Sequence, residues 1–256
     1  MTQELQDLDI IQNNGGMRMI LRKKQIISAS MLAADFKLSK VGSFQIIEDS
    51  ITELMGKLQI DGLTVKEKYN AFWVFTKTKV KFIKTLSWND EIILSSFISF
   101  ISAAKMNIDV EVKDSLGDLV FHSRTELCAL EIVNQRIIRL SMIGVDSSMV
   151  ENRELKEIEF AKIDEVDLPV VDKVKIKYTN IDFSHHTNNL EYIRLVMNTY
   201  SVKEMEEKQI KEMEIIYSNQ SYENDVLDIK KGTFVDKDFI VIEKDAKPVV
   251  KFEIIY

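Results

Sequence analysis

One order of predicted elements occurs twice along this chain of 256 residues: a strand, a long helix and then several antiparallel strands. Asp35-Phe36 in the first half matches Asp182-Phe183 in the second at an offset of 147 residues, and each pair precedes a predicted helix. The same offset pairs Trp73 with Gln220, and we expect both in the strand after their helix. A repeat this long indicates a duplicated domain rather than a solenoid. One long helix against a bent antiparallel sheet, formed twice, is an α+β architecture.

Hydrophobic periodicity places the elements of the first half. A strand is predicted over 17–30, after a polar segment that ends in turn-forming residues. Apolar residues at steps of three and four predict a helix over about 43–58, closed by a turn at Asp61-Gly62. Residues 68–140 are rich in strands, with a hairpin turn at 114–118.

The same pattern restarts after a polar, acidic segment. Alternation predicts a strand over 173–178, and apolar spacing predicts one helix over about 188–207. The remaining residues are read as strands. The predicted domains are an N-terminal unit over 1–148, a linker over 149–172 and a C-terminal unit over 173–256.

The composition excludes several classes of protein. Hydrophobic residues make up 45% and charged residues 29%, which is enough apolar mass for a packed core. The single cysteine, Cys128, excludes an internal disulfide and a multi-cysteine zinc site. The net charge of −7 disfavours nucleic acid as a partner. The sequence contains no run of eighteen apolar residues, so no membrane span is predicted. The N-terminus does not resemble a signal peptide, and we therefore expect a cytoplasmic protein.

One segment, 182–192, carries the residues most suited to chemistry. It holds two of the three histidines and joins a strand end to a helix start, where backbone N–H groups lack partners within the helix. Asp182 and His186, four residues apart beside those donors, suit hydrolysis of an activated acyl group. The alternative is structural: Asn188 or Asn189 caps the helix, Asp182 is a turn residue and the histidines are solvated.

The run D-x-x-x-H-x-N-N-x-x-Y, from Asp182 through His186 to Tyr192, resembles the C-terminal hotdog of the acyl-ACP thioesterases. The strand at 72–75 and the later segment at 87–92 resemble segments of that family's first hotdog. The resemblance implies two tandem hotdog domains that hydrolyse the thioester of a fatty acyl chain on acyl carrier protein. It also implies that the first hotdog binds the acyl chain and the second carries the catalytic motif.

Two positions differ from the family pattern. Ser184 stands where the family has Asn, and Gln220 where it has a Glu in a Y-x-x-E segment. Gln220 can hydrogen-bond a water but cannot take its proton. The resemblance implies catalytic roles for Asp182, His186, Ser184 and Gln220. In this view Asp182 activates water or attacks the acyl group directly, and His186 transfers protons or orients the water.

Further residues are predicted to bind the substrate. The helix start at Thr187, Asn188 and Asn189 would hold the thioester oxygen. Trp73, Phe75 and Phe44 would line an acyl tunnel in the first hotdog, although such residues are more often plain core. The first half has Ser39 at the position paired with His186, and it is expected to be chemically silent.

The partner implied by the resemblance is an acidic acyl carrier protein, and no metal or other cofactor is indicated. Lysines at i, i+2 spacing would place positive charge on two strand faces, which either dock the carrier or are simply solvated: Lys77, Lys79 and Lys81, with Lys84 near the same strand, and Lys173, Lys175 and Lys177. A homodimer is possible. The alternatives are a catalytically impaired acyl-ACP or acyl-CoA binding protein, an acyl-CoA thioesterase, a hotdog dehydratase or a purely structural protein.

Overall fold

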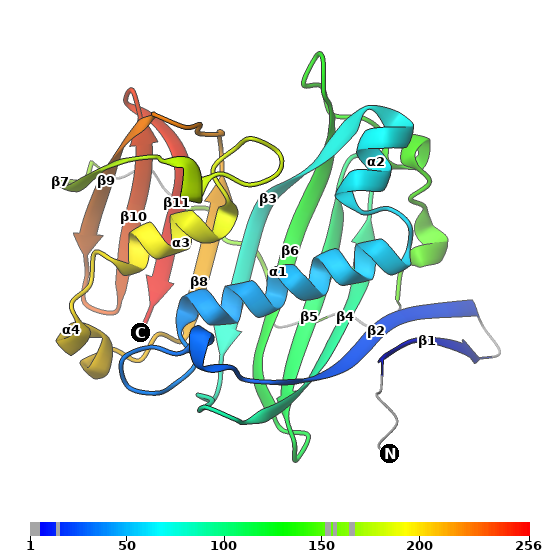
Figure 1. Ribbon diagram of the computed structural model, residues 1–256, viewed down its shortest axis with the longest axis horizontal. Coiled ribbons are helices and arrows are strands. Elements are labelled where there is room, and N and C mark those ends of the chain that lie inside the picture. Colours follow the sequence, from blue (N-terminus) through cyan, green and yellow to red (C-terminus); the bar gives the residue numbers. More distant parts are fainter. Residues whose placement is uncertain (1–5, 14–15, 152–154, 156–157, 164–166) are drawn as a thin grey trace.

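The computed structural model describes residues 6–13, 16–151, 155, 158–163 and 167–256 (Figure 1). Its first half contains the strands β1 (Gln6–Asn13), β2 (Gly16–Ile26), β3 (Ala71–Phe82), β4 (Glu91–Ile101), β5 (Met106–Asp114) and β6 (Leu119–Glu131), and the helices α1 (Lys40–Lys57) and α2 (Gly62–Tyr69). Its second half contains β7 (Val170–Lys175), α3 (Asn189–Met197), α4 (Val202–Glu207), β8 (Glu212–Tyr217), β9 (Val226–Thr233), β10 (Lys237–Lys244) and β11 (Lys247–Ile255).

All these strands belong to one sheet, in the order β1-β2-β4-β5-β6-β3-β8-β11-β10-β9-β7. Leaving β1 aside, each half lays out its five strands in the same spatial order, first-third-fourth-fifth-second. The second strands of the two halves, β3 and β8, pair antiparallel at the centre, with Thr78 opposite Ile215. The duplication and the predicted α+β class are therefore confirmed by topology.

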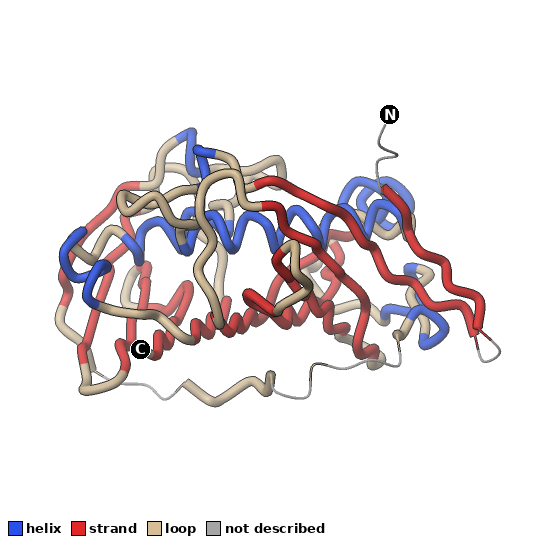
Figure 2. The backbone as a smooth tube through the Cα atoms, turned by 90° about the horizontal axis from the view of Figure 1, so that it is seen from below, coloured by secondary structure: helices blue, strands red, loops and turns tan. Residues whose placement is uncertain are grey.

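The long helices α1 and α3 cover one face of this sheet and contact each other (Figures 1 and 2). The α1 stripe predicted from periodicity is buried, with Phe44, Ile51 and Leu54 each at most 1% exposed. The same core continues across the β3–β8 junction to Ile215 and Ile193 of the second half. Because both halves share this core, the loop before α3 lies close to elements of the first half.

The register of the repeat differs from the prediction. Phe36 and His185, which are 149 positions apart, both have a positive φ, of 60° and 65°. Ser39 and Asn188, also 149 apart, are the N-caps of α1 and α3. Lys37, not Ser39, therefore corresponds to His186. The two halves share the backbone turn and the N-cap of the helix. The alignment of the two Asp-Phe dipeptides was therefore wrong by two residues.

Several predicted elements are corrected by the structure. β1 and α2 were not predicted, and β2 ends at Ile26, earlier than expected. Asp61 does not close a helix but begins α2, since its carboxylate accepts hydrogen bonds from the Leu63 and Thr64 amides. β8 ends at Tyr217, so Gln220 lies in the following loop rather than in a strand. β7 begins at Val170, within the segment predicted as linker. The hairpin turn between β5 and β6 is confirmed, with Gly117 at φ 90°.

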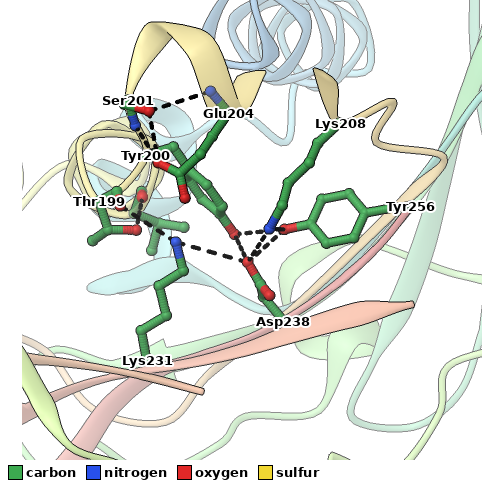
Figure 3. A network of polar contacts seen from close by, with 9 residues as sticks. Thr199, Tyr200, Ser201, Glu204, Lys208, Lys231, Asp238 and Tyr256 are labelled. Carbon is green, nitrogen blue, oxygen red and sulfur yellow. Dashed lines mark hydrogen bonds and ion pairs between the residues drawn. The ribbon is translucent and has the colours of Figure 1, made fainter. Parts of the chain in front are cut away.

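The single helix predicted over 188–207 is two helices, separated at a polar network (Figure 3). The buried carboxylate of Asp238 on β10 accepts hydrogen bonds from the hydroxyls of Tyr200, at 2.6 Å, and Tyr256. Although burial opposes it, these hydrogen bonds hold the pKa of Asp238 below its usual value. Lys231 lies 3.3 Å from the Tyr200 ring centroid and 3.7 Å from the carboxylate. Because Tyr200 is drawn down onto the sheet, the chain ends α3 and restarts at α4 with Ser201 as its N-cap.

The described residues of the connector between the halves, 155 and 158–163, lie on the face of the sheet opposite the helices (Figure 2). Arg124 of β6 makes a buried bidentate ion pair with Asp109 of β5, with both N–O distances 2.8 Å. The same guanidinium donates to the carbonyl oxygens of Leu155 and Ile158 in the connector. Leu155 and Ile158 then pack on Ile20 and Phe97 in a small second core. Arg124 therefore fastens the connector to the sheet.

Two glycines of α1 provide a matched test of its packing. A Cβ at Gly42 would lie 2.6 Å from the Met31 carbonyl oxygen, whereas a Cβ at Gly56 would have no neighbour within 4 Å. We expect Gly42→Ala to destabilise the protein by about 1–3 kcal/mol, since backbone must move. Gly56→Ala should stabilise it by about 0.5–1 kcal/mol. Urea denaturation of both variants measures the difference, and equal effects would mean that α1 does not approach Met31 so closely.

Candidate functional site

The loop that precedes α3 forms a tight turn that brings its polar side chains together. The Asp182 amide donates to the His186 carbonyl at 3.0 Å, and the His185 amide donates to the Asp182 carbonyl at 3.1 Å. His185 sits in the left-handed region that closes the turn, and its side chain is exposed. Asp182, Ser184 and His186, three of the four predicted catalytic residues, consequently point into one cluster.

These three residues form a continuous chain of hydrogen bonds. Asp182 Oδ1 accepts from the Ser184 amide at 2.8 Å and from the Ser184 hydroxyl at 2.5 Å. Ser184 Oγ lies 3.0 Å from His186 Nδ1. A hydroxyl has one hydrogen, so when it donates to the carboxylate it can only accept from the imidazole. His186 therefore carries its proton on Nδ1 when neutral, which leaves Nε2 with a free lone pair.

Aromatic rings from both halves enclose His186. Its ring centroid is 6.0 Å from that of Phe72 on β3 and 5.1 Å from that of Tyr222, which meets it nearly edge-on. Burial lowers the pKa of His186 from its ordinary 6.5, and the charge of Asp182 opposes this shift without reversing it. The imidazole is therefore mostly neutral at pH 7, which is the form that can accept a proton.

At the start of α3, Thr187 and Asn188 make hydrogen bonds within the protein, and Asn189 differs from them. The Thr187 amide and hydroxyl are both engaged with Ser221, which is fully buried and also contacts the Tyr192 hydroxyl at 2.8 Å. The Asn188 amide donates to Asn180, and the Asn188 side chain caps the helix by accepting from the Leu190 amide at 2.8 Å. Thr187 and Asn188 are thus committed to structure. Among the described contacts, the main-chain N–H of Asn189 has no acceptor, so it is the donor of the predicted trio that is left for a substrate oxygen.

Gln220 is not part of the Asp182–Ser184–His186 chain of hydrogen bonds, and it contacts His186 only indirectly, through Tyr222. Its side-chain oxygen accepts from the Tyr222 hydroxyl at 3.3 Å, and the Tyr222 ring in turn meets His186 nearly edge-on. Gln220 therefore supports the wall of the site through Tyr222.

The three aromatic residues predicted to line an acyl tunnel belong to the first-half core. Phe44 is 1% exposed, while Trp73 and Phe75 pack on the same core and are partly buried. Trp73 is held by a hydrogen bond of 2.7 Å from its indole N–H to the Ile60 carbonyl. The structure places these residues on the elements, α1 and β3, that approach the cluster from the first half.

Sequence reasoning missed Glu48, Phe72 and Tyr222. Glu48 is partly buried on α1, four residues after Phe44 and three before Ile51, so it interrupts the buried stripe. Burial, and then the charges of Asp49 and Asp182, raise the pKa of Glu48 to about 8. A carboxylate on an apolar helical stripe was a visible signal in the sequence.

Most lysines of the first predicted strand face are paired with acidic groups. Lys79 lies 3.0 Å from Glu214, and Lys81 lies 3.3 Å from Glu212. In the second face Lys173 pairs with Asp228, while Lys175 and Lys177 are exposed. Over the described part of the chain, no group of three or more His, Cys, Asp or Glu side chains is arranged to hold a metal ion. Nor does that part contain a helix long and apolar enough to span a membrane.

Comparisons with known proteins find similarity in sequence to one family. Residues 163–247 match the family model of the acyl-ACP thioesterase C-terminal domain. The chain is 21% identical over 168 residues to the palmitoyl-acyl carrier protein thioesterase of Arabidopsis thaliana, covering 62% of the chain and 41% of that protein. It is 23% identical over 170 residues to the dodecanoyl-[acyl-carrier-protein] hydrolase of Umbellularia californica, covering 62% of the chain and 44% of that protein. The matched part thus spans less than half the length of these relatives.

Solved structures extend the similarity to nearly the whole chain. An acyl-ACP thioesterase from Bacteroides thetaiotaomicron superposes with a TM-score of 0.85 at 14% identity, covering 92% of this chain and 97% of that one. The 12:0-ACP thioesterase from Umbellularia californica gives a TM-score of 0.81 at 15% identity, covering 92% and 96%.

The fold and the turn before α3 define a tandem hotdog protein, as predicted. The sequence matches then name its relatives: the chain is related to the acyl-ACP thioesterases, and the resemblance seen in its motif is confirmed.

Proposed function

We propose that this protein is an enzyme that hydrolyses the thioester of a fatty acyl chain on acyl carrier protein, releasing the free fatty acid. The observation that carries the proposal is the hydrogen-bonded chain Asp182–Ser184–His186 at the start of α3. The names of the relatives, a palmitoyl-acyl carrier protein thioesterase and a dodecanoyl-[acyl-carrier-protein] hydrolase, support the substrate class.

In the proposed reaction His186 is the general base. Its Nε2 takes a proton from a water molecule while the water oxygen bonds to the acyl carbon. Asp182 acts through Ser184, since the carboxylate fixes the hydroxyl and the hydroxyl fixes the imidazole tautomer. This places Asp182 as a positioning residue. Direct attack by its second oxygen remains the competing mechanism, because Oδ1 alone is engaged in the chain.

The carbonyl oxygen becomes negatively charged as water adds. We propose that the Asn189 N–H at the start of α3 donates to this oxygen, with help from the positive end of the helix dipole. The tetrahedral intermediate then breaks its C–S bond, the electron pair goes to sulfur, and the sulfur receives a proton. The products are a fatty acid and the thiol of the carrier.

The acid side of the pH profile tests this assignment. Because the base must be neutral, kcat/KM should fall as the pH drops through the pKa of His186, which burial sets below 6.5. Release of free thiol from acyl-ACP between pH 4.5 and 8 measures the profile. An acid limb centred above pH 6.5, or no acid limb, would contradict the role of His186.

The remaining features of the proposal concern the setting of the enzyme. We propose that it acts in fatty-acid synthesis in the cytoplasm, and that the first hotdog, 1–148, holds the acyl chain near Phe44, Trp73 and Phe75. The exposed Lys175 and Lys177, seven and five residues before Asp182 in the sequence, are the positive charges proposed to meet the acidic carrier. A homodimer would form through the edge strands β1 or β7. Acyl-ACP binding without thiol release would instead select a binding protein.

A further inference from the structure

Three buried hydroxyl groups meet directly beside the candidate site. Ser221 Oγ lies 2.7 Å from Thr187 Oγ1 and 2.8 Å from the Tyr192 hydroxyl. The Thr187 amide and hydroxyl also donate to the Ser221 carbonyl oxygen, at 2.9 Å and 3.1 Å. The hydroxyl cluster formed by Thr187, Tyr192 and Ser221 therefore joins the loop before α3, α3 itself and the loop after β8.

Each hydroxyl of this cluster donates once, and the hydrogen bonds run in one direction. The Thr187 hydroxyl donates to the Ser221 carbonyl, so its oxygen accepts from the Ser221 hydroxyl. Ser221 Oγ in turn accepts from the Tyr192 hydroxyl. Burial raises the pKa of Tyr192, which keeps this donor protonated. All three hydrogens are engaged within the cluster, so it is suited to holding segments in place rather than to relaying protons.

The loop after β8 has a counterpart in the first half of the chain. The Tyr222 amide donates to Asp225 Oδ2 at 2.8 Å, and the Ser87 amide donates to Asp90 Oδ2 at 2.7 Å. The residue before each aspartate is an Asn with a positive φ, of 72° and 65°. The two loops therefore have the same backbone conformation, and Ser87 corresponds to Tyr222.

The first half makes the same link between its loops without hydroxyl groups. Leu86, just before Ser87, corresponds to Ser221, and Leu38, just before the N-cap of α1, corresponds to Thr187. The Leu38 amide donates to the Leu86 carbonyl at 2.8 Å, as the Thr187 amide does to the Ser221 carbonyl. Two leucines thus suffice for this backbone link. The turn does not require the hydroxyl cluster, which is found in the half that carries the candidate site.

The groups proposed to act on the substrate adjoin the members of the hydroxyl cluster. His186 directly precedes one member, and Tyr222 directly follows another. The rings of His186 and Tyr222 are 5.1 Å apart. Asn189, whose N–H is proposed to hold the carbonyl oxygen, lies three positions before Tyr192 on α3. A shift of the loop after β8 would therefore move the base, its aromatic wall and the oxyanion donor relative to one another.

We propose that Ser221 is a positioning residue of the proposed thioesterase reaction. By joining the hydroxyl groups of the loop before α3 and of α3, it holds His186 against Tyr222 and at a fixed position relative to the Asn189 N–H. Geometry of this kind is effective because a misplacement of about 1 Å can cost on the order of 10²-fold in rate. This inference rests on the proposed hydrolysis of a thioester.

The test compares Ser221→Ala with wild type in thiol release from acyl-ACP. Alanine removes Oγ and with it both side-chain contacts of the cluster, to Thr187 and to Tyr192. We expect kcat to fall by about 10- to 10²-fold, because the base and the oxyanion donor are no longer held in register. KM should change little, since Ser221 is buried and does not touch the substrate.

The surroundings of His186 provide a readout of its position. Asp182 and His185, on its own loop, are the titratable groups that act on its pKa. Tyr222 and Phe72 face its ring from the loop after β8 and from β3. Burial, which these two rings provide in part, is the largest cause that lowers the pKa of His186. When Tyr222 moves away, water reaches the imidazole and this pKa rises toward 6.5.

In Ser221→Ala the acid limb of kcat/KM should therefore move to higher pH, because the base must be neutral. NMR titration of the His186 imidazole measures the same rise without substrate. Ser96→Ala is the matched control, since Ser96 is also fully buried and its hydroxyl donates to the Ser50 carbonyl at 3.3 Å on β4, in the first half. This control should keep the wild-type kcat and acid limb.

Tyr192→Phe provides a second variant, which keeps the buried ring and removes only the hydroxyl. Because Tyr192 acts through Ser221, the double variant Tyr192→Phe/Ser221→Ala should be no slower than Ser221→Ala. If Ser221→Ala is unstable, Tyr192→Phe should show a smaller fall in kcat and the same direction of change in the pKa of His186.

Wild-type kcat together with an unchanged His186 pKa in the Ser221→Ala variant would overturn the positioning role. Equal losses of rate in Ser221→Ala and Ser96→Ala would also overturn it. Absence of thiol release by wild type would instead overturn the proposed function, and the NMR titration distinguishes the two failures because it needs no hydrolysis.

Discussion

Replacing His186 with alanine is expected to lower kcat for acyl-ACP hydrolysis by about 10²- to 10⁴-fold. The variant loses Nε2, the only proton acceptor that the Asp182–Ser184 pair orients. The substrate should still bind, because the Asn189 N–H and the apolar walls are unchanged. The loss is therefore expected in kcat, with KM little altered, in steady-state assays of thiol release.

The adjacent histidine provides the control for this variant. His185 is exposed and has φ 65°, a conformation that Asn adopts readily. His185→Asn should keep the turn and nearly the full rate. A rate loss shared equally by both variants would show that the turn geometry matters and that the His186 imidazole does not act as the base.

Arg124→Ala is expected to cost about 3–5 kcal/mol in the free energy of unfolding. The side chain is 7% exposed and its partner Asp109 is 0% exposed, so the variant leaves a buried carboxylate without its guanidinium. It also removes the donors to the Leu155 and Ile158 carbonyls, which loosens the connector from the sheet. Chemical denaturation followed by circular dichroism measures the loss.

Two further variants distinguish the stability contribution of the buried Arg124–Asp109 pair from that of an exposed ion pair. Lys84, 43% exposed, pairs with Asp114 and Asp118 at a turn, so Lys84→Ala should cost less than about 1 kcal/mol. The double variant Arg124→Leu/Asp109→Leu should recover much of the loss, because no buried charge remains. A cost for Arg124→Ala as small as that for Lys84→Ala would contradict the connector contact.

The duplicated fold was predictable because its signals are local and repeated. The apolar stripe of α1 at Phe44, Ile51 and Leu54 has helical spacing, and it is buried as expected. The turn before α3 was also predictable, since Asn188 next to an apolar helix face is a strong N-cap signal. Its residues Asp182 and His186 do meet, through Ser184.

Features set by tertiary contacts were not predictable. The break between α3 and α4 depends on Tyr200 reaching Asp238, a residue 38 positions later. The same holds for the ring pair of His186 with Phe72, because β3 reaches the site only through the β3–β8 junction. The alignment of the two halves on their Asp-Phe dipeptides was wrong, because the halves share the backbone turn but not the side chains on it.

Ser184 shows that the chemistry of the site depends on where one hydroxyl group lies in the tertiary structure. From sequence it counted as a departure from the family pattern. In the structure its hydroxyl spans the gap between carboxylate and imidazole, with 2.5 Å on one side and 3.0 Å on the other. A short side chain suffices because the tight turn already brings Asp182 and His186 close.

Release of free thiol from acyl-ACP by the purified wild-type protein at neutral pH tests the proposed function most directly. The account predicts release in proportion to enzyme, with one fatty acid formed for each thiol, and faster turnover than for the same acyl chain on coenzyme A. Tight binding of acyl-ACP with no thiol above the uncatalysed rate would contradict it.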